Sequence, residues 1–257
     1  MARAEKTMGT RDIDLEPGLR ELGLVRMADI IKERLRVCQH EGWTPRRLLR
    51  ELIEEELAHR KERALQRRIH RASIPKDWTL ETFPFDLQTG VKRPQINEFA
   101  ELDFVREGIN LVFIAKTGRG KTGLASGLLL KALHSGYTGV RQRVQDLLDD
   151  LHRSIADRRT KHLLNRLSRL DVLVADELGY LNVSDEQANL FFKLMDNRYE
   201  ARKATLITTN LDYPDWGRHL KNPLMTDALL SRLRQRCVTI NIAGPDLRAP
   251  AADPAAG

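Results

Sequence analysis

A glycine-rich loop between an expected strand and an expected helix is the segment best suited to chemistry. The stretch Ala115–Thr122 reads Ala-Lys-Thr-Gly-Arg-Gly-Lys-Thr and directly follows the apolar run Leu111–Ile114. Its last three residues, Gly120, Lys121 and Thr122, match the end of the phosphate-loop pattern, whereas an alanine stands where the pattern begins with glycine. The other reading of this stretch is a glycine-rich turn without a ligand.

Each position of this loop has a chemical task in the phosphate-binding interpretation. Gly118 and Gly120 let the backbone turn its N–H groups toward phosphate oxygens, and the helix that follows aims its positive end at the same anion. Lys121 can reach the β- and γ-phosphates, and the Thr122 hydroxyl can ligate Mg2+. The candidate nucleotide-binding residues are Ala115, Lys116, Thr117, Gly118, Arg119, Gly120, Lys121, Thr122 and Gly123.

Two carboxylates end a second apolar run, Val172–Ala175. Asp176 is the candidate that holds Mg2+ through its water shell, and Glu177 is the candidate general base that orients and polarises an attacking water. A phosphate-transferring kinase has no need of a base beside the magnesium acid, so Glu177 favours hydrolysis. Exposed acids at the end of a strand are the alternative.

Polar and basic residues further along supply the remaining catalytic candidates. Asn210, or its neighbour Thr209, follows a strand and could contact the γ-phosphate or the water, provided that this strand lies between the other two. Arg232 is the candidate finger that completes the site of a neighbouring subunit. Ordinary turn chemistry and solvated or DNA-contacting arginines are the alternatives, and Arg234 or Arg236 could replace Arg232 as the finger.

A basic cluster lies between residues 151 and 170, where six Lys and Arg residues accompany one acid. Such a cluster can neutralise several phosphates and give salt-dependent, sequence-tolerant DNA binding, although a solvated helix face has the same composition. The candidate DNA-binding residues are Arg153, Arg158, Arg159, Lys161 and Arg166.

The elements that must position these residues alternate along the second half of the chain. Short apolar runs near residues 111–115, 137–143, 172–175, 204–208 and 238–242 alternate with helical patterns at 122–133, 144–156, 163–170, 184–199 and 226–233. This alternation predicts an α/β fold with a five-stranded parallel sheet that is covered on both faces. Such a sheet places ligands at the carboxyl ends of its strands, which is where the loop and the two acids would lie.

The rest of the chain divides into four further parts. Residues 1–16 read as a flexible tail, 17–70 as an N-terminal helical module for a partner, 71–108 as a connector to the ATPase core at 109–242, and 243–257 as a disordered tail. In the helical module, Leu24, Met27, Ile31 and Leu35 form one apolar stripe, and Leu49, Ile53 and Leu57 form another.

Composition excludes several other functions. Aromatic residues make up 5% of the 257 residues, which disfavours a stacking-based RNA binder, and two cysteines cannot make a disulfide scaffold. The net charge of +7 is compatible with a polyanionic partner, although an evenly solvated basic surface is the common explanation of such a charge. Because no apolar run is long enough to span a bilayer, we expect a cytoplasmic protein with no membrane partner.

Taken together, these motifs resemble those of the IstB-like ATPases. The resemblance rests on Val105–Phe113, the phosphate loop, Val172–Tyr180, Thr208–Leu211 and Asp227–Leu233, and it covers most of the chain. It implies an AAA+ P-loop NTPase core without a C-terminal lid, ATP and Mg2+ as cofactors, Asp176 and Glu177 as the Walker B pair, Asn210 as the first sensor and Arg232 as a finger acting in trans.

The same resemblance implies a function and its partners. The protein would oligomerise with ATP on duplex DNA, and would assist the transposase of the same insertion sequence in choosing and engaging a target. A DnaC-like loader of a replicative helicase is one alternative. A DNA-binding assembly factor that uses ATP only as a switch, without hydrolysis, is the other.

Overall fold

The computed structural model describes residues 14–75, 79–88, 90–179 and 183–248. The chain divides into two compact units, Met1–Gln66 and Arg67–Gly257. Helix α3 continues from the first unit past the boundary and ends at Arg71.

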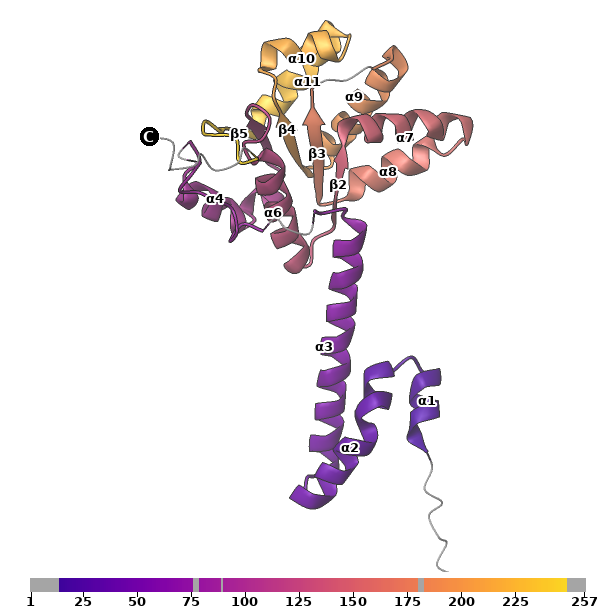
Figure 1. The fold of residues 1–257 in the computed structure, drawn as a ribbon. Coiled ribbons are helices and arrows are strands. Elements are labelled where there is room, and N and C mark those ends of the chain that lie inside the picture. The colour runs from indigo at the N-terminus through magenta and orange to yellow at the C-terminus, as the bar shows by residue number, and fades with distance from the viewer. Residues whose placement is uncertain (1–13, 76–78, 89, 180–182, 249–257) are drawn as a thin grey trace, which may run out of the picture. The chain divides into compact units, whose positions relative to one another are not determined.

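The N-terminal unit consists of helices α1 (Leu15–Glu21), α2 (Val25–Glu41) and α3 (Pro45–Arg71) (Figure 1). Proline is tolerated at the first position of α3, and the Thr44 hydroxyl accepts a hydrogen bond from the Arg47 N–H at that end. The core of this unit is small and consists of Met27, Ile30, Ile31 and Leu52, with Leu19, Leu24, Leu35 and Leu48 packed around it.

The second apolar stripe of this unit is not part of its core. Leu49, Ile53 and Leu57 are 56%, 49% and 51% exposed, so the expectation that they form the packing face of α3 is wrong. The buried face of the helix instead carries Leu52 and a carboxylate, Glu56. Burying Glu56 is tolerated because its two carboxylate oxygens are separately hydrogen-bonded to α2 and to its own helix.

The larger unit is built on a five-stranded, all-parallel sheet with the order β2-β3-β4-β1-β5. The strands are β1 (Asn110–Ile114), β2 (Gly139–Arg143), β3 (Val172–Leu178), β4 (Ala204–Thr209) and β5 (Cys237–Asn241). All five coincide with predicted runs, with ends shifted by a few residues. Strand β4 lies between β1 and β3, which is the condition that the sensor assignment required.

Helices connect these strands and cover the sheet on both faces (Figure 1). The connecting helices are α6 (Lys121–His134), α7 (Val144–Ala156), α8 (Thr160–Arg169), α9 (Asp185–Glu200), α10 (Tyr213–His219) and α11 (Pro223–Gln235). Helices α4 (Arg93–Ala100) and α5 (Asp103–Glu107) precede β1. Ser184 and Gln187 form a capping box at the start of α9, as their spacing predicts. Helix α10 was not predicted, because its seven residues are too few for a periodic pattern.

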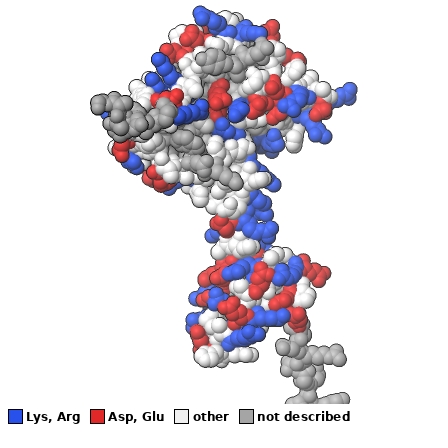
Figure 2. Space-filling model, viewed as in Figure 1, with Lys and Arg blue, Asp and Glu red and all other residues white. Residues whose placement is uncertain are grey.

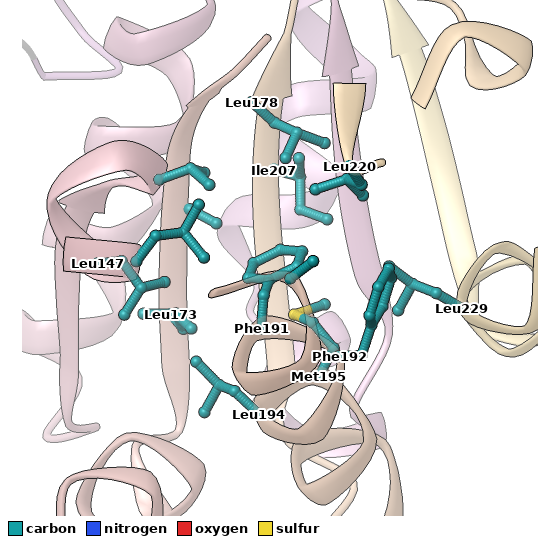
Figure 3. Packing of buried hydrophobic residues seen from close by; sticks show 14 of the residues in the cluster. Leu147, Leu173, Leu178, Phe191, Phe192, Leu194, Met195, Ile207, Leu220 and Leu229 are labelled. Carbon is teal, nitrogen blue, oxygen red and sulfur yellow. The ribbon is translucent and has the colours of Figure 1, made fainter. Parts of the chain in front are cut away.

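The two faces of the sheet are packed differently. Helix α6 covers one face and is almost entirely buried over its first three turns. On the other face, α7, α9 and α11 lie over the sheet, and Figure 3 shows Leu147, Phe191 and Leu229 from these helices converging on the strands. A large continuous core of this kind fixes the strands, and therefore the loops at their carboxyl ends.

No helix within the described ranges is both long enough and apolar enough to traverse a lipid bilayer.

Candidate functional site

The phosphate loop adopts the conformation that its glycines predict. Gly118 and Gly120 have φ angles of 79° and 87°, in the left-handed region that favours glycine. Space is also restricted, because a Cβ atom at Gly120 would lie 2.6 Å from the Phe83 ring and one at Gly118 would overlap the Asp246 carboxylate. Helix α6 begins at Lys121, so its N-terminus points into the concave side of the loop.

Lys121 lies across the opening of this loop. Its Nζ atom donates to the carbonyl oxygens of Ala115 at 2.6 Å and Lys116 at 2.9 Å. Burial lowers the pKa of Lys121, and the carboxylates of Asp176 and Glu177 oppose that shift. An ammonium group in this place is therefore available to a phosphate and lies in the field of both acids.

Asp176 is fully buried at the end of β3, and its two oxygens face different partners. Oδ1 accepts hydrogen bonds from Thr122 Oγ1 at 2.9 Å and from Thr208 Oγ1 at 2.5 Å. Oδ2 accepts from Arg141, whose Nε lies at 2.9 Å and whose Nη2 lies at 2.5 Å. The acid and the threonine hydroxyl predicted to share Mg2+ are thus in direct contact across the site.

Glu177 has an unusual backbone conformation next to the buried acid. Its φ angle is 60°, and the pairing of β3 with β4 shifts register between Ala175 and Leu178. The N–H of Glu177 donates to Thr208 Oγ1 at 2.9 Å, and its side chain points outward and is 59% exposed, with Arg143 Nε 3.6 Å from Oε2. Left-handed backbone at a non-glycine residue is a local strain that the surrounding structure must hold, and such strain gathers at functional sites.

The end of β4 completes the site. Thr209 and Asn210 both line the open cleft, but Thr209 is buried and its hydroxyl already donates to the Leu178 carbonyl at 2.5 Å. A Cβ at Gly179 would overlap the Asn210 amide oxygen, so the two loops pass close to each other. Of the two residues that the sequence left open as sensors, the geometry therefore favours Asn210.

These groups surround one cleft of about 640 Å³. Its lining includes the loop from Thr117 to Gly123, together with Arg141, Glu177 and Asn210. Acidic, basic and amide groups thus meet opposite a set of backbone N–H groups. The cleft contains oxygen donors of the kind that Mg2+ prefers, namely a carboxylate and a hydroxyl, beside a cradle for phosphates.

The C-terminal segment contacts this site, contrary to expectation. The Leu247 N–H donates to the Gly118 carbonyl at 2.9 Å, and the Gln88 side chain donates to the Pro245 carbonyl at 2.8 Å. Leu247 and Arg248 line the cleft. The predicted disorder from residue 243 is therefore wrong for residues 243–248, which main-chain hydrogen bonds hold in place, while residues 249–257 lie outside the described part of the chain.

The arginine candidates lie away from this cleft. Arg232, on α11, forms an ion pair with Asp196 of α9, at the rim of a separate cavity of about 390 Å³. Arg234 stacks over the Tyr213 ring at 5.2 Å. The structure does not bring Arg232 to the chain's own phosphate loop.

The basic cluster lies on the hairpin of α7 and α8. Arg153, Arg158, Arg159, Lys161 and Arg166 are all exposed. Figure 2 shows Lys and Arg side chains gathered toward the end of this hairpin. Arg153 is ion-paired at 3.1 Å with Asp150, an acid of α7 that directly precedes residues 151–170. Of the five residues, Arg153 is therefore partly neutralised within the chain.

Two residues of the site were not predicted as functional. Thr208 bridges the Asp176 carboxylate and the Glu177 N–H, and Arg141 donates two hydrogen bonds to Asp176. Thr208 is the first residue of a Thr-Thr-Asn run, and the other two residues of that run are the sensor candidates. The alternation of side chains along a strand could therefore have indicated Thr208 as well. For Arg141, no sequence signal exists, because its role depends on β2 pairing with β3.

A comparison of the chain with known proteins finds a matching family. Residues 18–253 match the family model described as IstB-like ATP binding protein. An insertion sequence IS21 ATP-binding protein of Pseudomonas aeruginosa is 31% identical over 235 residues, which cover 91% of this chain and 88% of the relative. An insertion sequence IS232 ATP-binding protein of Bacillus thuringiensis subsp. berliner is 30% identical over 77% of this chain and 78% of its own length.

Solved structures show the same core. The DnaC helicase loader superposes with a TM-score of 0.58 at 25% identity, over 65% of this chain and 98% of that chain. DnaI superposes with a TM-score of 0.54 at 21% identity, over 68% of this chain and 95% of that one. The likeness, together with the five-stranded parallel sheet, confirms the predicted α/β P-loop NTPase fold with an AAA+ core.

Proposed function

The chain belongs to the IstB-like ATP-binding protein family, and on that basis we propose that it is a Mg2+-dependent ATPase that assembles on duplex DNA and assists a transposase. The observation that carries the proposal is the cleft in which the phosphate loop faces Glu177, with the buried Asp176 hydrogen-bonded to the cleft-lining Thr122 at 2.9 Å. A loop that binds phosphates, an acid that holds the metal and an exposed carboxylate are the groups that ATP hydrolysis requires.

Each group of the cleft has a role in this reaction. The N–H groups of the loop and the helix α6 terminus bind the phosphates, and Lys121 neutralises the β- and γ-phosphates. Thr122 and Asp176 would hold Mg2+, which when bound draws charge from the phosphate oxygens. Glu177 accepts the proton of the attacking water, and Asn210 positions that water or the γ-phosphate.

The exposure of Glu177 suits a base that acts on water from the open side of the cleft. Its side chain is 59% exposed, whereas Asp176 is fully buried. Two neighbouring carboxylates in such different surroundings are suited to different tasks, one as a fixed anchor and the other as a proton acceptor. The Thr208 bridge to the Glu177 N–H keeps the base in this position.

Assembly and DNA binding extend the proposal beyond the single chain. Arg232 lies outside its own cleft, which fits a finger offered to a neighbouring subunit, and the hairpin of α7 and α8 presents exposed basic residues to a polyanion. The named relatives belong to insertion sequences. From this we propose duplex DNA and the transposase of the same element as partners.

The hydrolysis proposal is tested by phosphate release and ATP binding in wild type, Glu177→Gln and Lys121→Ala. We expect Glu177→Gln to bind ATP as wild type does and to lose hydrolysis at least a hundredfold, because the general base is removed. Lys121→Ala should lose both binding and hydrolysis. Wild-type protein that binds ATP and releases no phosphate, with or without duplex DNA, would support the non-hydrolysing switch instead.

A helicase loader is the second candidate, and the superposition on the DnaC helicase loader favours it. Both functions need the same ATPase core, so the partner decides between them. Full-length protein offered both the element's transposase and the host replicative helicase in the presence of ATP should retain the transposase. Retention of the helicase alone would favour the loader.

A further inference from the structure

Arg141 is the one cation in direct contact with Asp176 among the described residues, and it uses both acceptor sites of one carboxylate oxygen, Oδ2. Its Nε and Nη2 atoms both bond to Oδ2, at 2.9 and 2.5 Å, while Oδ1 is taken by the two threonine hydroxyls. A carboxylate offers about four acceptor sites, and all four of those on Asp176 are used by protein donors. Side chains of this chain therefore supply a donor for every acceptor site of Asp176.

Burial makes this contact important. Asp176 is fully buried and Arg141 is 15% exposed, so neither charge is well hydrated. A buried carboxylate without a counter-charge is strongly destabilising, and a planar guanidinium that meets it with two N–H groups is an effective partner. Arg141 thus does for Asp176 what a bound cation would do.

Mg2+ and this guanidinium would use the same oxygen. The Thr122 hydroxyl can ligate a metal through its oxygen and still donate its proton to Oδ1, so that side of the acid is compatible with Mg2+. Oδ2 is the remaining acceptor for the water shell of the metal, and Arg141 covers it. Two cations at one carboxylate also repel each other.

Room exists for the side chain to move. Arg141 lies on β2, at the edge of the sheet, and it lines the cleft together with Gly120 and Lys121 of the phosphate loop. A guanidinium that leaves Asp176 can therefore turn toward the phosphates without leaving the cleft. Arg143, two residues further along the strand, lines the same cleft and has no bond to Asp176 in the described structure.

We propose that Arg141 is an internal counter-ion that holds Asp176 in the metal-free protein and competes with Mg2+ for it when ATP binds. The inference rests on the proposed function, because it assumes a Mg2+–triphosphate complex in this cleft. The affinity for Mg2+ then depends on Arg141 of β2 as well as on the phosphate loop. Entry of the metal requires the guanidinium to release Oδ2.

Two measurements on Arg141→Gln test the competition. The first is the affinity for Mn2+, followed by electron paramagnetic resonance in the presence of a non-hydrolysable ATP analogue. We expect about tenfold tighter Mn2+ binding than in wild type, the scale on which groups around a metal ligand act. The second is the thermal midpoint in EDTA without nucleotide, which should fall by several degrees because Asp176 is left unpaired.

The matched control is Arg143→Gln, which removes one positive charge from the same strand and the same cleft. It leaves the contact between Arg141 and Asp176 intact, so its Mn2+ affinity should rise much less than that of Arg141→Gln, and its thermal midpoint should stay near that of wild type. Arg141→Lys, which keeps the charge but loses the paired geometry, should tighten Mn2+ binding less than Arg141→Gln does. Equal Mn2+ affinity in wild type and in Arg141→Gln that still binds the analogue would overturn the proposal.

A third measurement uses wild type and does not depend on the folding of a variant. The Arg141 Nε–H signal in a nitrogen-15 NMR spectrum, assigned from its loss in Arg141→Lys, should exchange slowly in metal-free protein and faster once Mg2+ and the analogue are added. Unchanged protection would contradict the release of Oδ2. Failure of wild type to bind the analogue at all would instead count against the proposed ATP site, while the expected drop in the thermal midpoint would still stand.

Discussion

Asp176 depends on hydrogen bonds from three different strands or helices. Thr122 lies in the first turn of α6, Thr208 is the second-last residue of β4 and Arg141 lies in β2, so the acid is held only when these elements are assembled around β3. The adjacent Glu177 is held in left-handed backbone by the same Thr208 hydroxyl. At the scale of single residues, Thr208 is therefore the positioning residue for both acids.

Replacing Thr208 by valine tests this role. Thr208→Val keeps the shape of the side chain but leaves the Glu177 N–H and one Asp176 lone pair without their partner. We expect ATP affinity to change little, kcat to fall about 10- to 100-fold, and the free energy of unfolding to fall by about 1–3 kcal/mol. Steady-state phosphate release and urea unfolding measure these effects.

Thr205→Val is the matched control, because Thr205 is also buried on β4 and its hydroxyl also accepts a hydrogen bond, from Arg198. This variant should lose stability while its kcat stays near that of wild type. Equal loss of kcat in both variants would mean that Thr208 acts through stability alone.

The sequence predicts the parts of the site that are local. The phosphate loop could be recognised because its glycines, lysine and threonine are consecutive, and Asp176 and Glu177 because they follow an apolar strand. Arg141 could not be predicted, since its contact arises only when β2 pairs with β3. The same limit explains why the C-terminal segment seemed disordered, because its hydrogen bonds go to Gln88 and Gly118, far away in the sequence.

Among the elements, helix α3 differs most from its sequence pattern. Its apolar stripe is exposed, and a carboxylate, Glu56, is buried in its place. Oε2 of Glu56 accepts from the Met27 N–H at 3.1 Å and Oε1 accepts from Arg60 Nε at 2.8 Å. Burial alone would raise the pKa of Glu56, but these hydrogen bonds outweigh it and hold the pKa below the ordinary value of 4.5.

This shift predicts a pH dependence for the N-terminal unit. A carboxyl group whose pKa is lower in the folded chain stabilises it above pH 4.5, and that contribution is lost as the pH falls through the folded pKa. Hydrogen exchange of α2 amides, corrected for intrinsic rates, should therefore show less protection below about pH 4.5.

Glu56→Gln should remove most of this pH dependence and lower protection at pH 7 by about 1–2 kcal/mol. Glu54→Gln, at an exposed position of the same helix, should behave as wild type. A pH dependence that persists in Glu56→Gln would assign it to other carboxylates.

The hairpin of α7 and α8 is the element proposed to bind DNA. Replacing both Arg158 and Arg159 by Glu should weaken duplex binding and reduce the slope of log affinity against log salt by about 2, because two phosphate contacts are lost. Fluorescence anisotropy at several salt concentrations measures the slope. The same charge change at Arg46 and Arg50, which are exposed in the N-terminal unit, is the control.

An equal effect of the two double variants would show that net charge, rather than the hairpin, determines binding. A slope unchanged by Arg158→Glu with Arg159→Glu would remove the hairpin from the DNA surface.

At the scale of the whole molecule, we propose that a second copy of the chain completes the active site. Arg232 is paired with Asp196 and lies at a different cavity from the phosphate loop. Arg232→Ala should bind ATP normally and lose hydrolysis. Mixing it with Glu177→Gln should restore part of the activity, because some interfaces then combine an intact Glu177 with an intact Arg232.

Parallel mixtures of Glu177→Gln with Arg234→Ala or with Arg236→Ala show which arginine is the finger. If only the Arg232 variant is inactive alone and active in the mixture, the assignment stands. Full activity of Arg232→Ala alone would exclude it as the finger.

The structure of Glu177→Gln with ATP and Mg2+ would show directly how the nucleotide lies in the cleft, because this variant should retain uncleaved nucleotide. We predict that the β- and γ-phosphates lie against the N–H groups of Gly118–Thr122, with the metal between Thr122 and Asp176 and residue 177 facing the γ-phosphate. A triphosphate bound elsewhere, or bound at the loop with its γ-phosphate turned away from residues 176 and 177, would contradict it.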